Sequence, residues 1–316
     1  KLINEGTIKG KIGIENNNGF TGTITVKNFE NKGTGTIDGH IYMGIWQGNR
    51  GTISIETFNN AGTITTSNNN DGVIYFEGTT HIKTFHNKQN GTIESKNGKN
   101  SISLKAQNNQ TPTLENFIND GTIKGKIGIE NKNGFTGTIT VKNFENKGTG
   151  TIDGDIYMGI WQGNRGTISI ENFNNEGTIK GGDRQGVYFE DIHSAIKTFK
   201  NTGFISGSGD NSQAGGLMTG GGVVMSGGTI ETFINKGTIK STGTNHDPAG
   251  VKLNYATVKT FENTGLISGL NGFLTTKGTI ETFKNKGTIE STSKGGREAA
   301  IKIQAVYSNT SSIAHF

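Results

Sequence analysis

The stretch FINDGTIKG, Phe117 to Gly125, decides the fold of this chain, because close copies of its first five residues recur along the whole sequence. Phe followed by Asn two positions later occurs ten times, and nine of these copies place Gly two residues after the Asn. Intervals of 22 to 34 residues between copies of one motif are typical of solenoids and propellers. The ten phenylalanines are Phe29, Phe58, Phe85, Phe117, Phe144, Phe173, Phe199, Phe233, Phe261 and Phe283.

A second, longer period lies above the first. Residues 3–64 match residues 118–179 at an offset of 115, with five differences. Four of the short repeats were therefore duplicated as one block. Because the chain opens and closes inside its own repeat, we expect residues 1–316 to be a single solenoid segment of a longer protein.

Within each interval, apolar residues alternate with polar or small ones, as in Lys11 to Glu15 and Gly186 to Glu190. A period of two indicates β-strands. Each interval holds about three such runs, which predicts a right-handed parallel β-helix of about 11 rungs with three short strands per rung. A propeller blade needs about 40 to 50 residues, too many for these intervals, and the hexapeptide repeat of left-handed β-helices is missing.

The motif itself has a mechanical interpretation. We expect Phe to point inward and stack on the Phe of the next rung, and Asn to bond to backbone and to its copies in neighbouring rungs. Gly would adopt a left-handed backbone conformation at the corner. The longest intervals are expected to carry loops, with 96–112 and 206–228 as the largest.

Composition narrows the possible functions. Only 30% of residues are apolar, which suits a thin continuous core. No cysteine is present, so disulfides and thiolate metal sites are excluded. The net charge of +5 comes from 31 basic and 26 acidic residues scattered through every repeat, which argues against nucleic acid as a partner.

Candidate chemistry is sparse. Asp38 and Asp153 occupy equivalent positions, where a corner hydrogen bond explains them better than catalysis does. The histidines show neither zinc-ligand spacing nor a nucleophile partner, and 206–215 lacks the nonapeptide period of calcium-binding repeats. We therefore expect no cofactor, no metal and no enzymatic activity.

The duplicated stretch IYMGIWQGNRG, residues 41–51 and 156–166, is the strongest candidate for binding. If Ile41, Met43 and Ile45 face inward, the period of two sends the intervening aromatic residues outward, next to amides and Arg. Such surfaces suit sugar rings or a protein partner; alternatively, the two tryptophans cover a neighbouring loop. The candidate binding residues are Tyr42, Trp46, Gln47, Arg50, Tyr157, Trp161, Gln162 and Arg165, and Tyr75 and Tyr188 would extend the same face.

The Phe-x-Asn-x-Gly-x-Ile rungs, the absence of Cys and the wealth of Asn, Thr and Gly resemble passenger regions of autotransporter (type V secreted) proteins. The nearest likeness is to adhesins and vacuolating-cytotoxin-like surface proteins of epsilon-class proteobacteria. The resemblance implies an extracellular protein, on the bacterial surface or secreted, that serves as an adhesin or structural stalk. Its expected partner is a host-cell surface protein or glycan, with self-association a further option. A cytotoxin segment and a β-helical polysaccharide-degrading enzyme are the alternatives.

Overall fold

The computed structural model describes residues 1–16, 19–45, 51–67, 72–106, 108–131, 136–160, 166–190, 193–209, 220–244, 247–305 and 311–315. These residues form 34 β-strands, which is eleven sets of three followed by β34. Each strand pairs in parallel with the strands at the same position in the neighbouring turns, so every third strand belongs to one sheet. The chain is thus an all-β parallel β-solenoid with three parallel sheets, as the sequence predicts.

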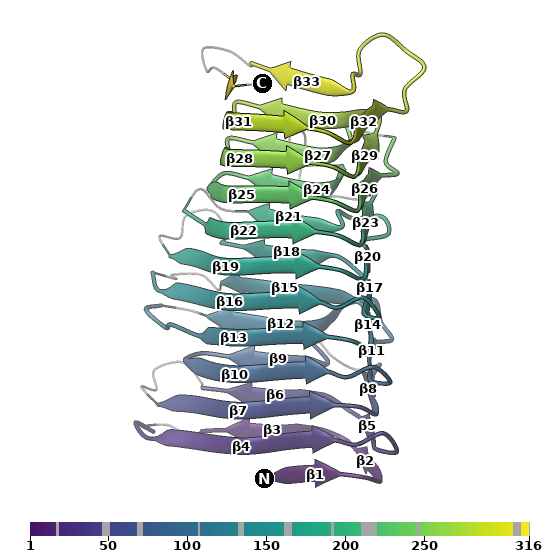
Figure 1. Cartoon of the computed structure of the whole chain (residues 1–316). Helices are drawn as coiled ribbons and strands as arrows, with labels where there is room; N and C mark the ends of the chain where they lie inside the picture. Colours follow the sequence, from purple (N-terminus) through teal and green to yellow (C-terminus); the bar gives the residue numbers. More distant parts are fainter. Residues whose placement is uncertain are drawn as a thin grey trace. The chain divides into compact units, whose positions relative to one another are not determined.

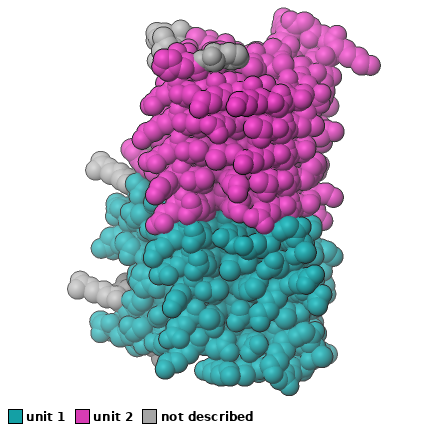
Figure 2. Space-filling model, in the orientation of Figure 1, with its two compact units in different colours: residues 1–152, 160–169 teal, residues 153–159, 170–316 magenta. Residues whose placement is uncertain are grey.

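The chain divides into two compact units (Figure 2). Unit 1 comprises 1–152 and 160–169, and unit 2 comprises 153–159 and 170–316. The division falls within β17 (Thr151–Asp153) and β19 (Thr167–Asn175). We call the sheet that carries the Phe motif sheet A, the sheet that follows the motif glycine sheet B, and the remaining sheet C.

Unit 1 contains strands of all three sheets, which the chain visits in the order A, B, C. Sheet A holds β1 (Leu2–Asn4), β4 (Thr23–Asn31), β7 (Thr52–Asn60), β10 (Thr80–Asn87), β13 (Thr113–Asn119) and β16 (Thr138–Asn146). Sheet B holds β2 (Thr7–Lys9), β5 (Thr36–Asp38), β8 (Thr63–Thr66), β11 (Thr92–Ser95) and β14 (Thr122–Lys124). Sheet C holds β3 (Ile12–Glu15), β6 (Ile41–Gly44), β9 (Ile74–Glu77), β12 (Asn100–Ala106) and β15 (Lys126–Asn131).

Unit 2 repeats this arrangement with shorter sheet A strands. Sheet A holds β22 (Ala195–Asn201), β25 (Thr229–Asn235), β28 (Thr257–Asn263), β31 (Thr279–Asn285) and β34 (Ser312–His315). Sheet B holds β20 (Thr178–Lys180), β23 (Phe204–Gly207), β26 (Thr238–Ser241), β29 (Leu266–Gly269) and β32 (Thr288–Ser291). Sheet C holds β18 (Ile156–Gly159), β21 (Val187–Glu190), β24 (Gly221–Ser226), β27 (Ala249–Asn254), β30 (Asn271–Thr276) and β33 (Ile301–Gln304).

The winding is right-handed. In Figure 1, β4 runs from left to right at the front, β5 lies at the right edge, and β6 runs from right to left behind. The next turn, which begins with β7, lies above β4. Strands β25, β26 and β27 of unit 2 follow the same path (Figure 1).

Stacked phenylalanine rings form the centre of each unit. In unit 1, Phe29 and Phe58 stack with ring centroids 4.4 Å apart, and Phe117 and Phe144 do the same. In unit 2, the rings of neighbouring turns from Phe173 to Phe283 lie 4.6 to 4.9 Å apart. These spacings, and the 5.2 Å between Phe85 and Phe117, lie close to the separation of about 4.8 Å between strands in a sheet, so rings of neighbouring turns stack on one another. The inward Phe prediction is confirmed.

The motif asparagines form a second internal ladder. Asn87 donates its side-chain amide to Oδ1 of Asn119 at 2.8 Å, and Asn119 donates to Oδ1 of Asn146 at 2.8 Å. Each amide also reaches backbone carbonyls, as Asn87 does with Gly91 and Thr122. All of these asparagine side chains are buried, and their mutual bonds offset the cost of removing an amide from water. The predicted polar ladder is confirmed.

The expected role of the motif glycine is wrong. The backbone of Gly121 does not lie in the left-handed region, and neither does that of Gly203 or Gly237. Instead, a Cβ added to Gly121 would lie 2.3 Å from the carbonyl oxygen of Gly91 in the preceding turn. At Gly121, as at Gly203 and Gly237, Gly is required because the backbone of the preceding turn lies too close for any side chain, whereas Gly33 and Gly148 have no such close neighbour.

The two expected loop segments are also wrong in part. Residues 96–112 contain β12, and residues 206–228 contain β24, each the sheet C strand of its turn. Their glycines and polar residues suggested loops, yet both strands pair with neighbouring sheet C strands, with one shift of register between Asn100 and Ile102 of β12. Residues 210–219 lie outside the described residues.

Candidate functional site

The predicted binding face begins on sheet C, and six of its eight residues lie outside the described part of the chain. These six residues are Trp46, Gln47, Arg50, Trp161, Gln162 and Arg165. The strands that lead into them are as expected, because Ile41, Met43 and Ile45 are buried in the interior. The tryptophans and their polar neighbours therefore remain a prediction.

Tyr42 does not form the exposed aromatic surface that the alternation suggested. It lies on the opposite face of β6 from Met43, yet only 6% of its surface is exposed. Its hydroxyl donates to Oε2 of Glu77 at 3.0 Å, and the ring of Tyr75 lies 5.4 Å away. Nζ of Lys11 lies 4.8 Å from the ring centroid. Side chains of neighbouring turns therefore cover Tyr42.

Tyr157 is the equivalent residue in the second copy and is 7% exposed, so the same correction applies. Its hydroxyl donates to Oε2 of Glu190 at 2.7 Å. The ring of Tyr188 lies 5.6 Å away, and Val224 follows in the next turn. Burial, together with the charge of Glu190, raises the pKa of Tyr188. The phenol of Tyr188 is therefore neutral at physiological pH. Tyr157, Tyr188 and Val224 together form a covered cluster.

The sequence carries a signal for these tyrosine clusters. Tyr75 and Glu77, like Tyr188 and Glu190, stand two residues apart on one strand and so share a face. The register then brings the Tyr of the preceding turn beside them, since Tyr42 pairs with Tyr75. A Tyr-x-Glu pattern one turn after a Tyr could have identified both clusters.

Lys252 continues this outer face of sheet C in unit 2, where it pairs with Val224 on one side and Leu274 on the other. Only 2% of its surface is exposed. Burial lowers the pKa of Lys252 to about 8, against the opposing effect of Asp247, while the charge of Lys302 lowers it further. Lys302 itself forms an ion pair with Asp247 at 3.3 Å. The amine of Lys252 is therefore partly neutral near pH 8.

A second candidate surface lies on the outer face of sheet A in unit 1, where an open groove crosses β7, β10, β13 and β16. Charges of both signs and hydroxyl groups line it. Within the groove, Nζ of Lys142 lies 3.3 Å from Oε1 of Glu115. The lining residues are Ser54, Ile55, Glu56, His81, Ile82, Lys83, Thr113, Glu115, Thr140 and Lys142. Sequence reasoning missed this groove, because it becomes visible only when the turns are aligned.

Four groove residues belong to a longer pattern, which we call the charge column. It consists of the residue two positions before each motif phenylalanine, and its sign alternates without exception. In unit 1 the column is Lys27, Glu56, Lys83, Glu115 and Lys142, and in unit 2 it is Glu171, Lys197, Glu231, Lys259 and Glu281. All ten side chains are exposed or half-buried.

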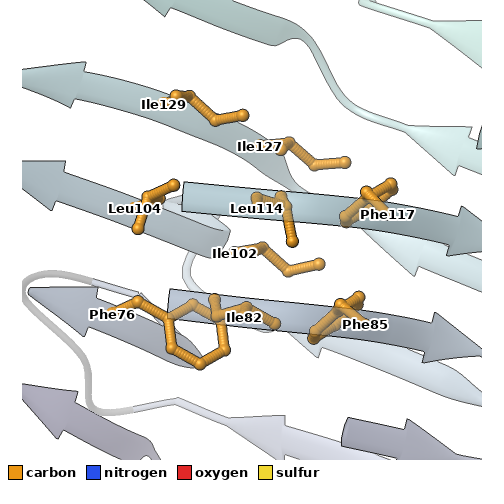
Figure 3. Close-up of a pocket in the computed structure, with 9 residues that line it drawn as sticks. All are labelled: Phe76, Ile82, Phe85, Ile102, Leu104, Leu114, Phe117, Ile127 and Ile129. Carbon is orange, nitrogen blue, oxygen red and sulfur yellow. The ribbon is translucent and has the colours of Figure 1, made fainter. Parts of the chain in front are cut away.

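One interior void can be described in unit 1. A void of about 10 Å³ in unit 1 lies where Leu104 and Ile129 follow the larger Phe76 on sheet C (Figure 3). Its walls are apolar, with Phe85 and Phe117 on the opposite side (Figure 3). A space of this size holds about one water molecule at most, so it is a packing defect.

The described part of the chain has neither a metal-binding cluster nor a membrane-spanning helix. No group of three or more His, Asp or Glu side chains there could hold a metal ion. No described helix is long and apolar enough to cross a membrane.

Comparison with known proteins likewise yields no relative: no protein-family model, no curated protein and no solved structure matches the chain significantly. The fold and the outer surfaces therefore carry the functional argument.

Proposed function

We propose that this chain is a β-solenoid segment of a bacterial autotransporter passenger, displayed on the cell surface or secreted, that acts as an adhesin or structural stalk contacting host cells. The sequence resemblance to such passengers supports this proposal, and so does the architecture. The motif Phe and Asn of each turn point inward and join ladders that run from turn to turn. The outer positions are then free to vary without loss of the fold.

The duplicated block illustrates this freedom. Its five differences are Glu5/Asp120, Asn17/Lys132, His40/Asp155, Thr57/Asn172 and Ala61/Glu176. The first, fourth and fifth lie at exposed or half-buried positions, while Asp155 is buried and the Asn17/Lys132 pair lies outside the described residues. The interior Phe and Asn of the motif are unchanged in both copies. A stalk or binding surface built on such a frame can alter its outer chemistry while it keeps its length and register.

The observation that carries the binding proposal is the open groove of unit 1. It presents carboxylates, ammonium groups and hydroxyls along one face of β7, β10, β13 and β16. An open polar groove suits an extended chain, such as a glycan or a peptide of a host-cell surface protein, since each turn supplies one set of contacts. The segments 46–50 and 161–165, which contain the two tryptophans and lie outside the described residues, are the second candidate region.

The enzymatic alternative would use the same groove. Glu56 and Glu115 lie two turns apart, and Lys83 stands between them in the column. A glycosidase needs one protonated and one ionised carboxyl group. Glu115 is already engaged in an ion pair with Lys142, which favours a binding role.

The test measures saturable binding of the purified chain to epithelial cells and to a glycan panel. A groove variant, Lys83→Ala/Lys142→Ala, and a tryptophan variant, Trp46→Ala/Trp161→Ala, are compared with the unmodified protein. Loss of binding in one of them, with the circular dichroism spectrum unchanged, identifies the contacting face. Treatment of the cells with protease or with glycosidase distinguishes a protein receptor from a glycan.

Lys240→Ala/Lys286→Ala provides the matched control, because it removes two exposed lysines outside the groove and the column. Saturable binding that survives in the control and is lost in at least one of the two test variants would support the proposal. Absence of binding by the unmodified chain would contradict the adhesin function and leave a structural stalk as the remaining part of the proposal. Release of reducing ends from a polysaccharide would overturn the binding proposal in favour of the enzyme.

A further inference from the structure

The alternation of the charge column is stricter than that of any other outer column of sheet A. The column one residue nearer the phenylalanine contains only Asn and Thr, from Asn28 to Thr282. The column just after the phenylalanine mixes Glu, Asn, His, Ile and Lys without a fixed order. Ten consecutive charged residues of alternating sign therefore belong to one column alone.

Contacts within the chain explain only part of this pattern. Oppositely charged neighbours do meet, as Lys142 and Glu115 do at 3.3 Å, and Lys259 and Glu231 at 3.9 Å. Exposed pairs of this kind contribute only about 0 to 1 kcal/mol each, and ordering two long side chains costs entropy. The adjacent Asn and Thr column shows that uncharged residues stack equally well, for example through the 2.9 Å bond between Asn143 and Asn116. Fold stability therefore does not require charge in this column.

A surface with this pattern is complementary to another surface with the same spacing. Strand separation fixes the spacing at about 4.8 Å per turn, and a second copy of the chain has the same spacing. If two unit 1 faces meet about a twofold axis perpendicular to the column, with an odd offset in turns, each column charge that meets another faces one of opposite sign. Lys27 then faces Glu115 of the second copy, and Glu56 faces Lys83 of the second copy. An even offset would place like charges together.

The adjacent outer column of Asn and Thr allows such an approach. The Asn and Thr column offers short, uncharged side chains that donate and accept hydrogen bonds, so it brings no unpaired charge into a contact. Five Lys and five Glu also make the column neutral as a whole, despite the net charge of +5 of the chain. Two such faces therefore do not repel each other at long range.

We propose that the outer face of sheet A is a homotypic docking surface, on which the charge column selects a second copy of this chain and fixes the register between the two. This inference goes beyond the proposed function and does not depend on any host receptor. Electrostatic complementarity of this kind sets register and partner choice more than raw affinity. The association is consequently expected to be salt-sensitive.

The test uses the full chain and two charge-sorted variants. In the all-lysine variant the column glutamates become lysine, and in the all-glutamate variant the column lysines become glutamate. The substitutions are E56K, E115K, E171K, E231K and E281K in the first, and K27E, K83E, K142E, K197E and K259E in the second. Sedimentation velocity at about 20 mM and about 500 mM NaCl reports the oligomeric state of each protein and of their mixture.

We expect the unmodified chain to self-associate at low salt and to dissociate at high salt. Each charge-sorted variant alone should stay monomeric, and the equimolar mixture should associate at least about ten-fold more tightly than the unmodified chain, since every register is then complementary. A milder variant with the column glutamates changed to glutamine should also lose self-association, which keeps the test valid if a sorted variant fails to fold. Retained self-association in that variant would overturn the proposal.

Net charge alone could also attract the two sorted variants to each other. Each substitution changes the net charge by two, so from +5 the all-lysine variant reaches +15 and the all-glutamate variant reaches −5. A control therefore carries the same −5 at exposed lysines outside the column: K9E, K124E, K180E, K240E and K286E. The all-lysine variant should bind this control at least about ten-fold more weakly than it binds the all-glutamate variant. Equal binding, or an unmodified chain that stays monomeric at about 200 µM and low salt, would overturn the proposal.

Discussion

The side-chain amide of Asn87 donates a 2.8 Å hydrogen bond to Oδ1 of Asn119, 32 residues later in the sequence and one turn further along unit 1. Both side chains are completely buried. The same amide reaches the carbonyl oxygens of Gly91 and Thr122. One side chain thus ties together the corner of its own turn and the corner of the next.

Asn119→Ala is expected to destabilise the protein, because it leaves the amide of Asn87 without its acceptor and Oδ1 of Asn146 without its donor. A buried polar group left unsatisfied costs about 1 to 3 kcal/mol. Urea denaturation followed by circular dichroism measures the change in the free energy of unfolding. Asn143→Ala is the matched control, since Asn143 belongs to an outer, part-buried column. Equal losses in the two variants would contradict the buried ladder.

Phe233→Ala should lower the free energy of unfolding more than Asn119→Ala does. The ring of Phe233 is buried between Phe199 and Phe261, with ring centroids 4.6 Å and 4.8 Å away. Removal of a buried Phe side chain costs about 3 to 5 kcal/mol through lost burial and the cavity left behind. The control is Phe204→Thr. Phe204 stands, half-buried, in an outer column where its partners Thr178 and Thr238 are threonine. This control should change the midpoint of urea denaturation little.

The sequence predicted these ladders because each depends on a residue type at a fixed place in a repeat. The motif glycine shows the limit of that reasoning. A left-handed backbone and a close approach both demand Gly, and residue identity alone does not distinguish them. At Gly121 the answer lies in the carbonyl oxygen of Gly91, which belongs to the preceding turn.

The tyrosines show a similar limit. Period two placed Tyr42 correctly on the outer face of its strand, but it carried no information on what covers that face. The covering groups come from Lys11, about one turn before, and Glu77, about one turn after. Only the register between turns brings them together. The charge column, by contrast, can be read from the sequence alone, because it emerges when the turns are aligned on their phenylalanines.

Lys252 should make stability depend on pH. Its pKa is about 8 in the folded protein and about 10.5 in the unfolded chain. Between these values the unfolded chain holds more protons, so the contribution of this group to the free energy of unfolding rises with pH. Below about pH 8 both states are protonated and the full cost of burying the charge is present.

Lys252→Met removes that cost, so the variant should be more stable than the unmodified chain at pH 7, by on the order of a few kcal/mol. The advantage should shrink steadily as the pH rises from about 8 toward 10.5. Urea denaturation of both proteins at several pH values measures it. Lys240→Met, at an exposed position, controls for the loss of one positive charge. An advantage of Lys252→Met that stayed constant over this range would refute the assignment.

The last prediction concerns the charge column within a single chain. Glu115→Lys places three ammonium groups in consecutive turns, because Lys83 and Lys142 flank this position. It also removes the ion pair that Glu115 forms with Lys142 in the unmodified chain. At low ionic strength we expect this variant to lose about 0.5 to 1 kcal/mol more stability than Glu115→Gln, which removes the pair without adding repulsion. Added salt screens exposed charges, so about 0.5 M NaCl should remove most of the difference. Thermal melts at about 1 µM protein keep self-association out of the measurement. A difference that does not respond to salt would show that the alternation does not act through charge.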